Sequence, residues 1–160
     1  MIVLLLACAD ADTPPVEDLS EGATGPARLY LNELMADVNA GGDWLEIYNA
    51  AAEGVDIGGY VLADETGEQS ALPDGTVAPA EGFLFVWCGG DRGDGEAWVT
   101  IRLDKDGDKV SLSHLDGEAT VVDDAISWDS LNGMVAVARV PDGGPDWVYD
   151  GTPSPGTSNI

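Results

Sequence analysis

Two short segments joined by a glycine-containing turn, in residues 31–49, restrict the fold of this chain more than any other stretch. The sequence reads LNELMADVNAGGDWLEIYN. Leu29 and Leu31 alternate with polar or aromatic neighbours in the first segment, and Leu45 and Ile47 do so in the second. A period of two residues is typical of a β-strand whose two faces lie in different surroundings. We therefore predict two neighbouring strands over residues 29–35 and 44–49.

The rest of the chain repeats this alternation of short strand and turn, without helical periodicity. Pro73-Asp74-Gly75 and Asp116-Gly117 are turn signals, because proline presets the first bend and glycine accepts a positive φ. Further strands are predicted over residues 60–63, 83–88, 97–103, 110–115, 120–128 and 134–140. Many short strands separated by such turns predict an all-β fold, an antiparallel β-sandwich.

An ordered set of residues resembles the lamin tail domain family, over about residues 28–159. The set consists of Asn32-Glu33, the Trp44–Asn49 run, Gly59, Leu62, Pro73-Asp74-Gly75, the Lys105–Asp108 turn, Val110-Ser111-Leu112, Pro155-Gly156 and Asn159. The resemblance implies a compact immunoglobulin-like sandwich, which occurs in nuclear lamins and in many secreted bacterial proteins. It does not imply filament formation or DNA binding, because the chain shows neither coiled-coil heptads nor a basic patch.

The charge balance bears on the partners. Thirty Asp and Glu residues stand against six Lys and Arg residues, which gives a formal net charge of −24. Affinity for nucleic acids depends on Lys and Arg that neutralise phosphates, so DNA and RNA are not expected as partners. An acidic surface favours solubility and, in some proteins, cation binding.

The first residues are similar to the signal of a bacterial lipoprotein. An apolar run, Ile2 to Ala7, ends in Leu5-Leu6-Ala7-Cys8, which resembles a lipobox. The resemblance implies that Cys8 becomes the lipidated first residue of the mature protein and anchors it to a membrane. A secretory signal needs a basic n-region and 7–15 apolar residues, so we expect residues 1–7 to be a truncated signal whose true start lies upstream.

The segment after Cys8 predicts a tether. Residues 8–27 are acidic and rich in small residues and proline, so they are expected to be disordered, with the lamin tail domain at 28–160. Ala9, rather than Asp, follows the lipidated cysteine, and the usual sorting pattern then favours the outer membrane or cell surface. The other cysteine, Cys88, lies in an apolar strand and is expected to be a buried thiol. A Cys8–Cys88 disulfide is the alternative.

Glu33 and Glu46 are the only carboxylates placed as a candidate catalytic pair. They lie on neighbouring predicted strands, as the paired carboxylates of glycosidases do. The competing interpretation is that both accept hydrogen bonds that hold the strands together, and we favour it. His114 is the single histidine, and it has neither a nucleophile-elbow serine nor paired cysteines to complete a catalytic triad or a zinc site.

Two acidic loops are candidates for weak calcium binding of the extracellular type. Neither follows the EF-hand spacing, and the competing interpretation is a solvated turn with Asp and Gly at the bend positions. The candidate ligands are Asp91, Asp94, Glu96, Asp104, Asp106 and Asp108.

Trp98 is the best candidate for an exposed ligand platform, because it alternates with the inward-facing Ala97 and Val99. Exposed aromatic residues indicate binding when they cluster on the surface. We therefore predict a non-enzymatic, lipid-anchored protein of the bacterial cell envelope, acting as an interaction or structural module with an unknown protein or glycan ligand. The alternatives are weak calcium-dependent adhesion or carbohydrate binding, and, least favoured, a hydrolase using Glu33 and Glu46.

Overall fold

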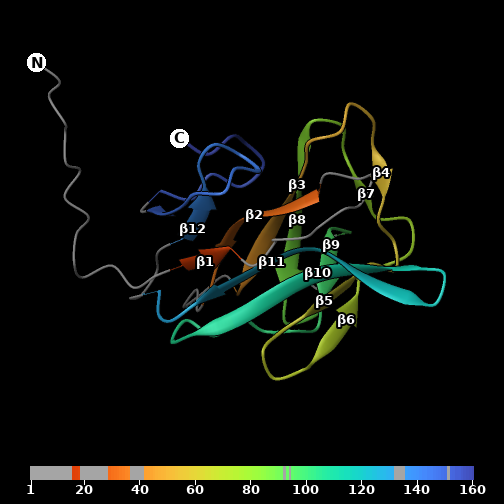
Figure 1. Ribbon diagram of the computed structural model, residues 1–160, viewed down its shortest axis with the longest axis horizontal. Helices are drawn as coiled ribbons and strands as arrows, with labels where there is room; N and C mark the ends of the chain where they lie inside the picture. Colours follow the sequence, from red (N-terminus) through yellow and green to blue (C-terminus); the bar gives the residue numbers. More distant parts are fainter. Residues whose placement is uncertain are drawn as a thin grey trace, which may run out of the picture.

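The computed structural model describes residues 16–18, 29–36, 42–91, 93, 95–131, 136–150 and 152–160. All regular secondary structure in these residues is β-strand, and the strands form two facing sheets and a small third one (Figure 1). The predicted all-β, immunoglobulin-like sandwich is confirmed.

The first sheet has five strands in the order β1-β11-β10-β5-β6, and every pairing in it is antiparallel. Its strands are β1 (Val16–Asp18), β5 (Val61–Ala63), β6 (Gln69–Ala71), β10 (Asp108–Asp116) and β11 (Ala119–Trp128).

The second sheet has six strands in the order β13-β12-β2-β3-β8-β9, and only β8 and β9 run parallel. Its strands are β2 (Leu29–Met35), β3 (Trp44–Asn49), β8 (Gly82–Cys88), β9 (Ala97–Val99), β12 (Ala136–Arg139) and β13 (Trp147–Asp150). A separate pair joins β4 (Val55–Asp56) to β7 (Val77–Ala78).

The core lies between the two large sheets and follows the predicted alternation. Leu45 and Ile47 of β3 and Val86 of β8 point inward, each at most 1% exposed, and Leu112 and Ile126 come from the opposite sheet. Cys88 is likewise buried, as expected. Burial of such apolar side chains supplies most of the stabilisation of the sandwich.

β4, β6, β7 and β13 are not among the predicted strands. Two further segments also differ from the prediction. Regular pairing in the predicted strand 97–103 ends at Val99, although Ile101 and Leu103 are buried as expected. Side chains of other strands and loops take over the hydrogen bonds there, because Ser70 accepts from the Thr100 amide and Asp43 from the Leu103 amide.

The second difference is β1, which falls inside the segment expected to be a disordered tether. Val16 to Asp18 pair with Ile126 to Trp128 of β11. Val16 packs against the core, which gives this short acidic segment a reason to be ordered. The remainder of residues 8–27, Cys8 included, lies outside the described residues.

Two β-bulges each insert one extra polar residue into a strand. One lies in β2 at Asn32, between the paired residues Leu31 and Glu33, and the other lies in β11 at Asp123, opposite the step from Leu112 to Ser113. A bulge re-aims a side chain relative to the regular alternation. Both bulge residues are buried and take part in the contacts described below.

Candidate functional site

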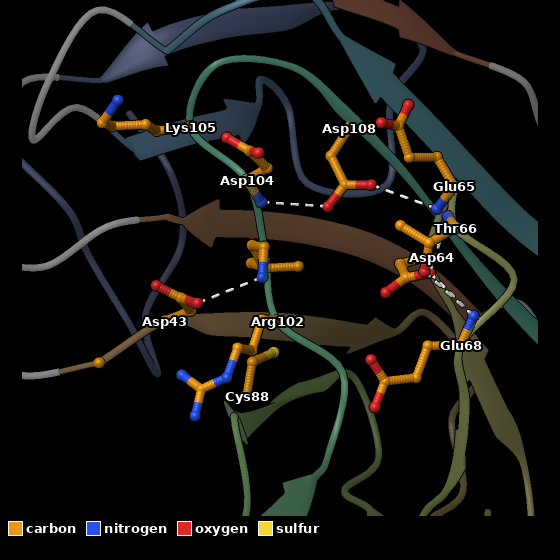
Figure 2. Close-up of a pocket in the computed structure, with 12 residues that line it drawn as sticks. Asp43, Asp64, Glu65, Thr66, Glu68, Cys88, Arg102, Asp104, Lys105 and Asp108 are labelled. Carbon is orange, nitrogen blue, oxygen red and sulfur yellow. Dashed lines mark hydrogen bonds between the residues drawn. The ribbon is translucent and has the colours of Figure 1, made fainter.

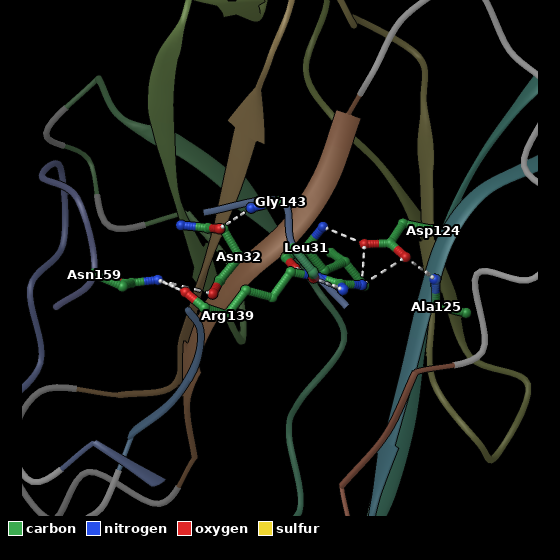
Figure 3. Close-up of polar contacts among 8 residues, drawn as sticks. Leu31, Asn32, Asp124, Ala125, Arg139, Gly143 and Asn159 are labelled. Carbon is green, nitrogen blue, oxygen red and sulfur yellow. Dashed lines mark hydrogen bonds and ion pairs between the residues drawn. The ribbon is translucent and has the colours of Figure 1, made fainter. Parts of the chain in front are cut away.

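A buried ion pair joins the two large sheets. Arg139 of β12 places Nη2 3.0 Å from both carboxylate oxygens of Asp124 of β11, and the two side chains are 1% and 0% exposed (Figure 3). Leu31 of β2 completes the arrangement, because its amide donates to Asp124 at 2.7 Å and its carbonyl accepts from Arg139 Nε at 2.8 Å. The pair therefore ties three strands together in the core.

Aromatic and backbone groups hold the guanidinium of Arg139 on its other sides. Its Cζ lies 4.6 Å from the centre of the Trp147 ring, and Nη1 donates to the Gly144 carbonyl. Sequence periodicity alone does not reveal this ion pair. The available signal was an arginine inside an apolar run, Val137-Ala138-Arg139-Val140, in a chain with few cations.

Glu33 and Glu46 lie directly opposite each other on β2 and β3, as predicted, but both are at most 1% exposed. Their oxygens accept hydrogen bonds from the segment 152–159, which we call the C-terminal strap. The Ser154 amide donates to Glu33 at 3.0 Å, and the Gly156 amide donates to Glu46 at 2.6 Å. Carboxylates used in this way hold chain segments together, so the geometry favours the structural interpretation over a glycosidase pair.

Asn159 fastens the end of the strap. Its Nδ2 donates to the carbonyls of Asn32 at 3.2 Å and Arg139 at 3.0 Å (Figure 3). Asn32 in turn donates to Glu46 at 3.2 Å and Asp142 at 3.0 Å. The strap, the β2 bulge and the loop after β12 therefore form one hydrogen-bonded unit.

Burial shifts the acidity of three carboxylates in the same direction. Desolvation raises the pKa of Glu46 above its ordinary 4.5, although hydrogen bonds from Gly156 and Asn32 lower it in part. Desolvation also raises the pKa of Asp108 and of Asp123 above 3.8, against hydrogen bonds that lower it.

These shifts predict that mild acid stabilises the protein. A raised pKa means that the folded state binds the proton more tightly, so this contribution is complete below 3.8–4.5 and is lost as the pH rises through the raised values. Relief of repulsion within a chain of net charge −24 acts in the same direction. We expect thermal melts to give a higher Tm near about pH 5 than near about pH 7, by about 2–4 °C for each kcal/mol gained.

A matched variant isolates one of the groups. Glu46→Gln removes the titrating carboxyl and should flatten the dependence of Tm on pH. A Tm that climbs steadily from pH 5 to pH 7 in the unmodified chain would contradict the prediction.

An acidic hollow of about 660 Å³ lies beside the turn between residues 104 and 108 (Figure 2). Here the carboxylates are engaged in the turn itself. Asp104 accepts from the Asp106 amide at 2.8 Å, and Asp108 accepts from the amides of Asp104 at 3.1 Å and Glu65 at 3.2 Å. Gly107 is required because a Cβ at this position would lie 2.7 Å from the Asp129 carbonyl. The segment is thus a close-packed turn.

The candidate calcium ligands lie at two separate places, as two separate acidic loops imply. Asp104 and Asp108 line the acidic hollow, and Asp106 lies beside the ammonium of Lys105 at 2.7 Å. Asp91 and Glu96 line a different groove. Asp94 lies outside the described residues. Among the side chains that the structure places, no three of the His, Cys, Asp and Glu type form a group suited to a metal ion.

The second groove, about 570 Å³, runs beside β9, and we call it the β9 groove. The predicted platform residue Trp98 lines it, together with Asp74, Val77, Asp91 and Glu96. Glu96 also accepts a hydrogen bond from the indole of Trp87. The structure thus brings Trp98 together with acidic residues from both neighbouring loops.

A row of tryptophans crosses the outer face of the second sheet. Trp44 of β3, Trp87 of β8 and Trp98 of β9 lie opposite one another in register. Residues in register on neighbouring strands project from the same face. Phe85 packs between the first two, with ring centres 5.3 Å from Trp44 and 4.8 Å from Trp87. The row depends on strand order, so the sequence alone does not reveal it.

His114 pairs with a carboxylate and an aromatic ring, and the neighbouring Ser113 is directed elsewhere. Its Nδ1 lies 2.7 Å from the buried carboxylate of Asp123, and its ring stacks on Tyr60 at 5.0 Å. The neighbouring Ser113 instead donates to the Val61 carbonyl.

Within the described ranges, no helix has the length and apolar character needed to cross a membrane. In comparison with known proteins, the family model described as Lamin Tail Domain matches residues 23–130, which is more than half of the chain. No curated protein matches the chain significantly.

Proposed function

The chain belongs to the lamin tail domain family, and on this premise we propose that it is a non-enzymatic interaction or structural module of the bacterial cell envelope. The proposal concerns a β-sandwich that presents its surface to a partner. Catalysis plays no part in it.

The state of the Glu33–Glu46 pair carries the non-enzymatic part of the proposal. A pair of catalytic carboxylates needs room for a glycosidic bond between them. Glu33 and Glu46 are instead at most 1% exposed and accept backbone hydrogen bonds from the C-terminal strap. The best-placed acid pair in the sequence is therefore already committed to holding the fold.

The location rests on the sequence before the domain. Leu5-Leu6-Ala7-Cys8 resembles a lipobox, and we propose that Cys8 carries the lipid. Ala9 supports sorting to the outer membrane or cell surface. The acidic and proline-containing composition of residues 9–15 supports a solvated connection between lipid and domain, which ends where Val16 joins β11.

Membrane fractionation with intact mass spectrometry tests this proposal. The gene, including its upstream segment, is expressed in a bacterial host beside a matched Cys8→Ser variant. We expect the unmodified protein in the membrane fraction, with a mass that corresponds to cleavage before Cys8 plus acyl chains, and the variant without them. A soluble, unacylated product from both versions would overturn the envelope location.

The choice of ligand follows the described surface. Among the described residues no three side chains of the His, Cys, Asp and Glu type form a group suited to a metal ion, so no observation favours calcium-dependent adhesion. The β9 groove combines an indole with carboxylates, and it is the surface to which we assign the interaction.

A further inference from the structure

The open edge of β9 leads to an inference that rests on the proposed role as an interaction module and names its partner class. We propose that β9 and the β9 groove bind an extended peptide segment rich in Lys and Arg, which adds to the second sheet as a further strand.

The first support is the position of β9. It is the terminal strand of its sheet, and in the part of the chain that the structure describes no strand pairs with its outer side. The Val99 carbonyl accepts from the Gly90 amide at 2.8 Å, so the backbone of Val99 faces the β8 side. Successive residues of a strand direct their backbone groups to opposite sides. The amide and carbonyl of Trp98 therefore point to the open edge.

Thr100, two residues after Trp98, follows the same alternation of backbone direction. The Thr100 amide donates to Ser70 Oγ of β6, at 2.9 Å, and not to the β8 side. Trp98 and Thr100 hence present their backbones to the same side, where a side chain already serves Thr100. An added strand would supply the equivalent partner for Trp98, which is the mode of recognition called β-augmentation.

The second support is the chemistry of the β9 groove, which includes Ala97 and Trp98 at the start of β9. Trp98 offers an indole, and Val77, 51% exposed, offers an apolar surface. Asp74, Asp91 and Glu96 surround them, and no Lys or Arg is among the described residues that line the groove. An indole flanked by carboxylates attracts ammonium or guanidinium groups, by charge and by cation–π contact.

Charge complementarity indicates which class of ligand would bind in the β9 groove. The whole chain carries −24, so long-range attraction favours a cationic partner and disfavours acidic peptides and phosphates. A basic side chain fits the indole and the acids, while an apolar side chain fits Val77. An extended peptide with alternating basic and apolar residues satisfies the open backbone and both kinds of side-chain contact.

A defined peptide tests the inference. The probe is acetyl-Lys-Val-Arg-Val-Lys-amide, titrated into the full chain carrying Cys8→Ser, with amide resonances followed by NMR. We expect shifts concentrated on residues 97–99 and 74–77. The same peptide methylated at the central amide nitrogen keeps its charge but loses one strand hydrogen bond, and we expect about fivefold weaker binding.

Matched variants of the protein separate the groove from general charge. Trp98→Ala should weaken binding about tenfold, and Trp98→Tyr should restore much of it. Asp74→Asn, in the groove, should weaken binding about twofold to threefold. Asp116→Asn removes the same charge from the β10–β11 turn, which does not line the groove, and should leave binding unchanged.

Three results would overturn the inference. The first is the absence of NMR shifts at millimolar peptide. The second is an equal loss of affinity in Asp74→Asn and Asp116→Asn, with shifts spread over the surface, and the third is shifts at residues 97–99 and 74–77 with the neutral sugar cellohexaose but not with the peptide. Because the soluble chain is used, failure here leaves the envelope proposal untouched. Failure of membrane fractionation likewise leaves peptide binding intact.

Discussion

Arg139→Met is expected to lower the free energy of unfolding by roughly 3–5 kcal/mol, because it leaves the Asp124 carboxylate buried without its countercharge. Both side chains are at most 1% exposed, so water cannot replace the lost partner. The carbonyls of Leu31 and Gly144 lose their donors as well. For a chain of this size the Tm should fall by roughly 6–20 °C, which urea denaturation and thermal melts will measure.

The double variant Arg139→Met with Asp124→Asn shows whether the loss comes from the unpaired charge. The introduced amide side chain keeps an oxygen for the Leu31 amide but carries no charge, so the double variant should be less destabilised than the sum of the two single variants. Arg102→Met is the matched control, because Arg102 is exposed beside the acidic hollow, and it should change stability by less than about 0.5 kcal/mol. A loss below about 1 kcal/mol in Arg139→Met would contradict the structural role.

Ending the chain after residue 150 removes the C-terminal strap and is expected to lower the free energy of unfolding by roughly 3–6 kcal/mol. The reason is the loss of two hydrogen bonds, from the amides of Ser154 and Gly156 to the carboxylates of Glu33 and Glu46. Hydrogen bonds to charged groups contribute about 1.5–3 kcal/mol each. Hydrogen exchange should show lost protection at β2 and β3, whose outer side chains the strap covers. The expected decrease can be read directly from urea denaturation.

Two smaller changes define which part of the strap matters. Asn159→Ala removes the donors to the Asn32 and Arg139 carbonyls and should reproduce part of the loss. Deletion of Ile160 alone is the control, because this residue is fully exposed. A truncated chain as stable as the full one would show that the Glu33–Glu46 pair does not need the strap.

Sequence periodicity predicted the central strands well, for a physical reason. β2, β3 and β8 each have six or seven residues, which is long enough for alternation between a core face and an outer face to become visible. β1, β6 and β7 have two or three residues. Such segments are strands only because a neighbour supplies hydrogen bonds, and their own sequence cannot show this.

The candidate sites also differ in how far their own sequence can reveal them. Trp98 was identifiable because its own strand alternates, whereas the row of Trp44, Trp87 and Trp98 depends on strand order. The acidic turn at residues 104–108 was ambiguous, because carboxylates that cap backbone amides have the same spacing as calcium ligands. Asp124 and Arg139 could not be paired from sequence, since they meet only when the two sheets pack.

The order of β1 sets how far the domain can travel from the proposed lipid. A fully extended chain spans at most roughly 26–29 Å from residue 8 to residue 16, and Val16 is already fixed to β11. If the sandwich began at Leu29, the same calculation would give roughly 70–75 Å. Three ordered residues therefore shorten this reach by more than half, and an acylated domain would occupy a shell about as deep as a bilayer's hydrocarbon core.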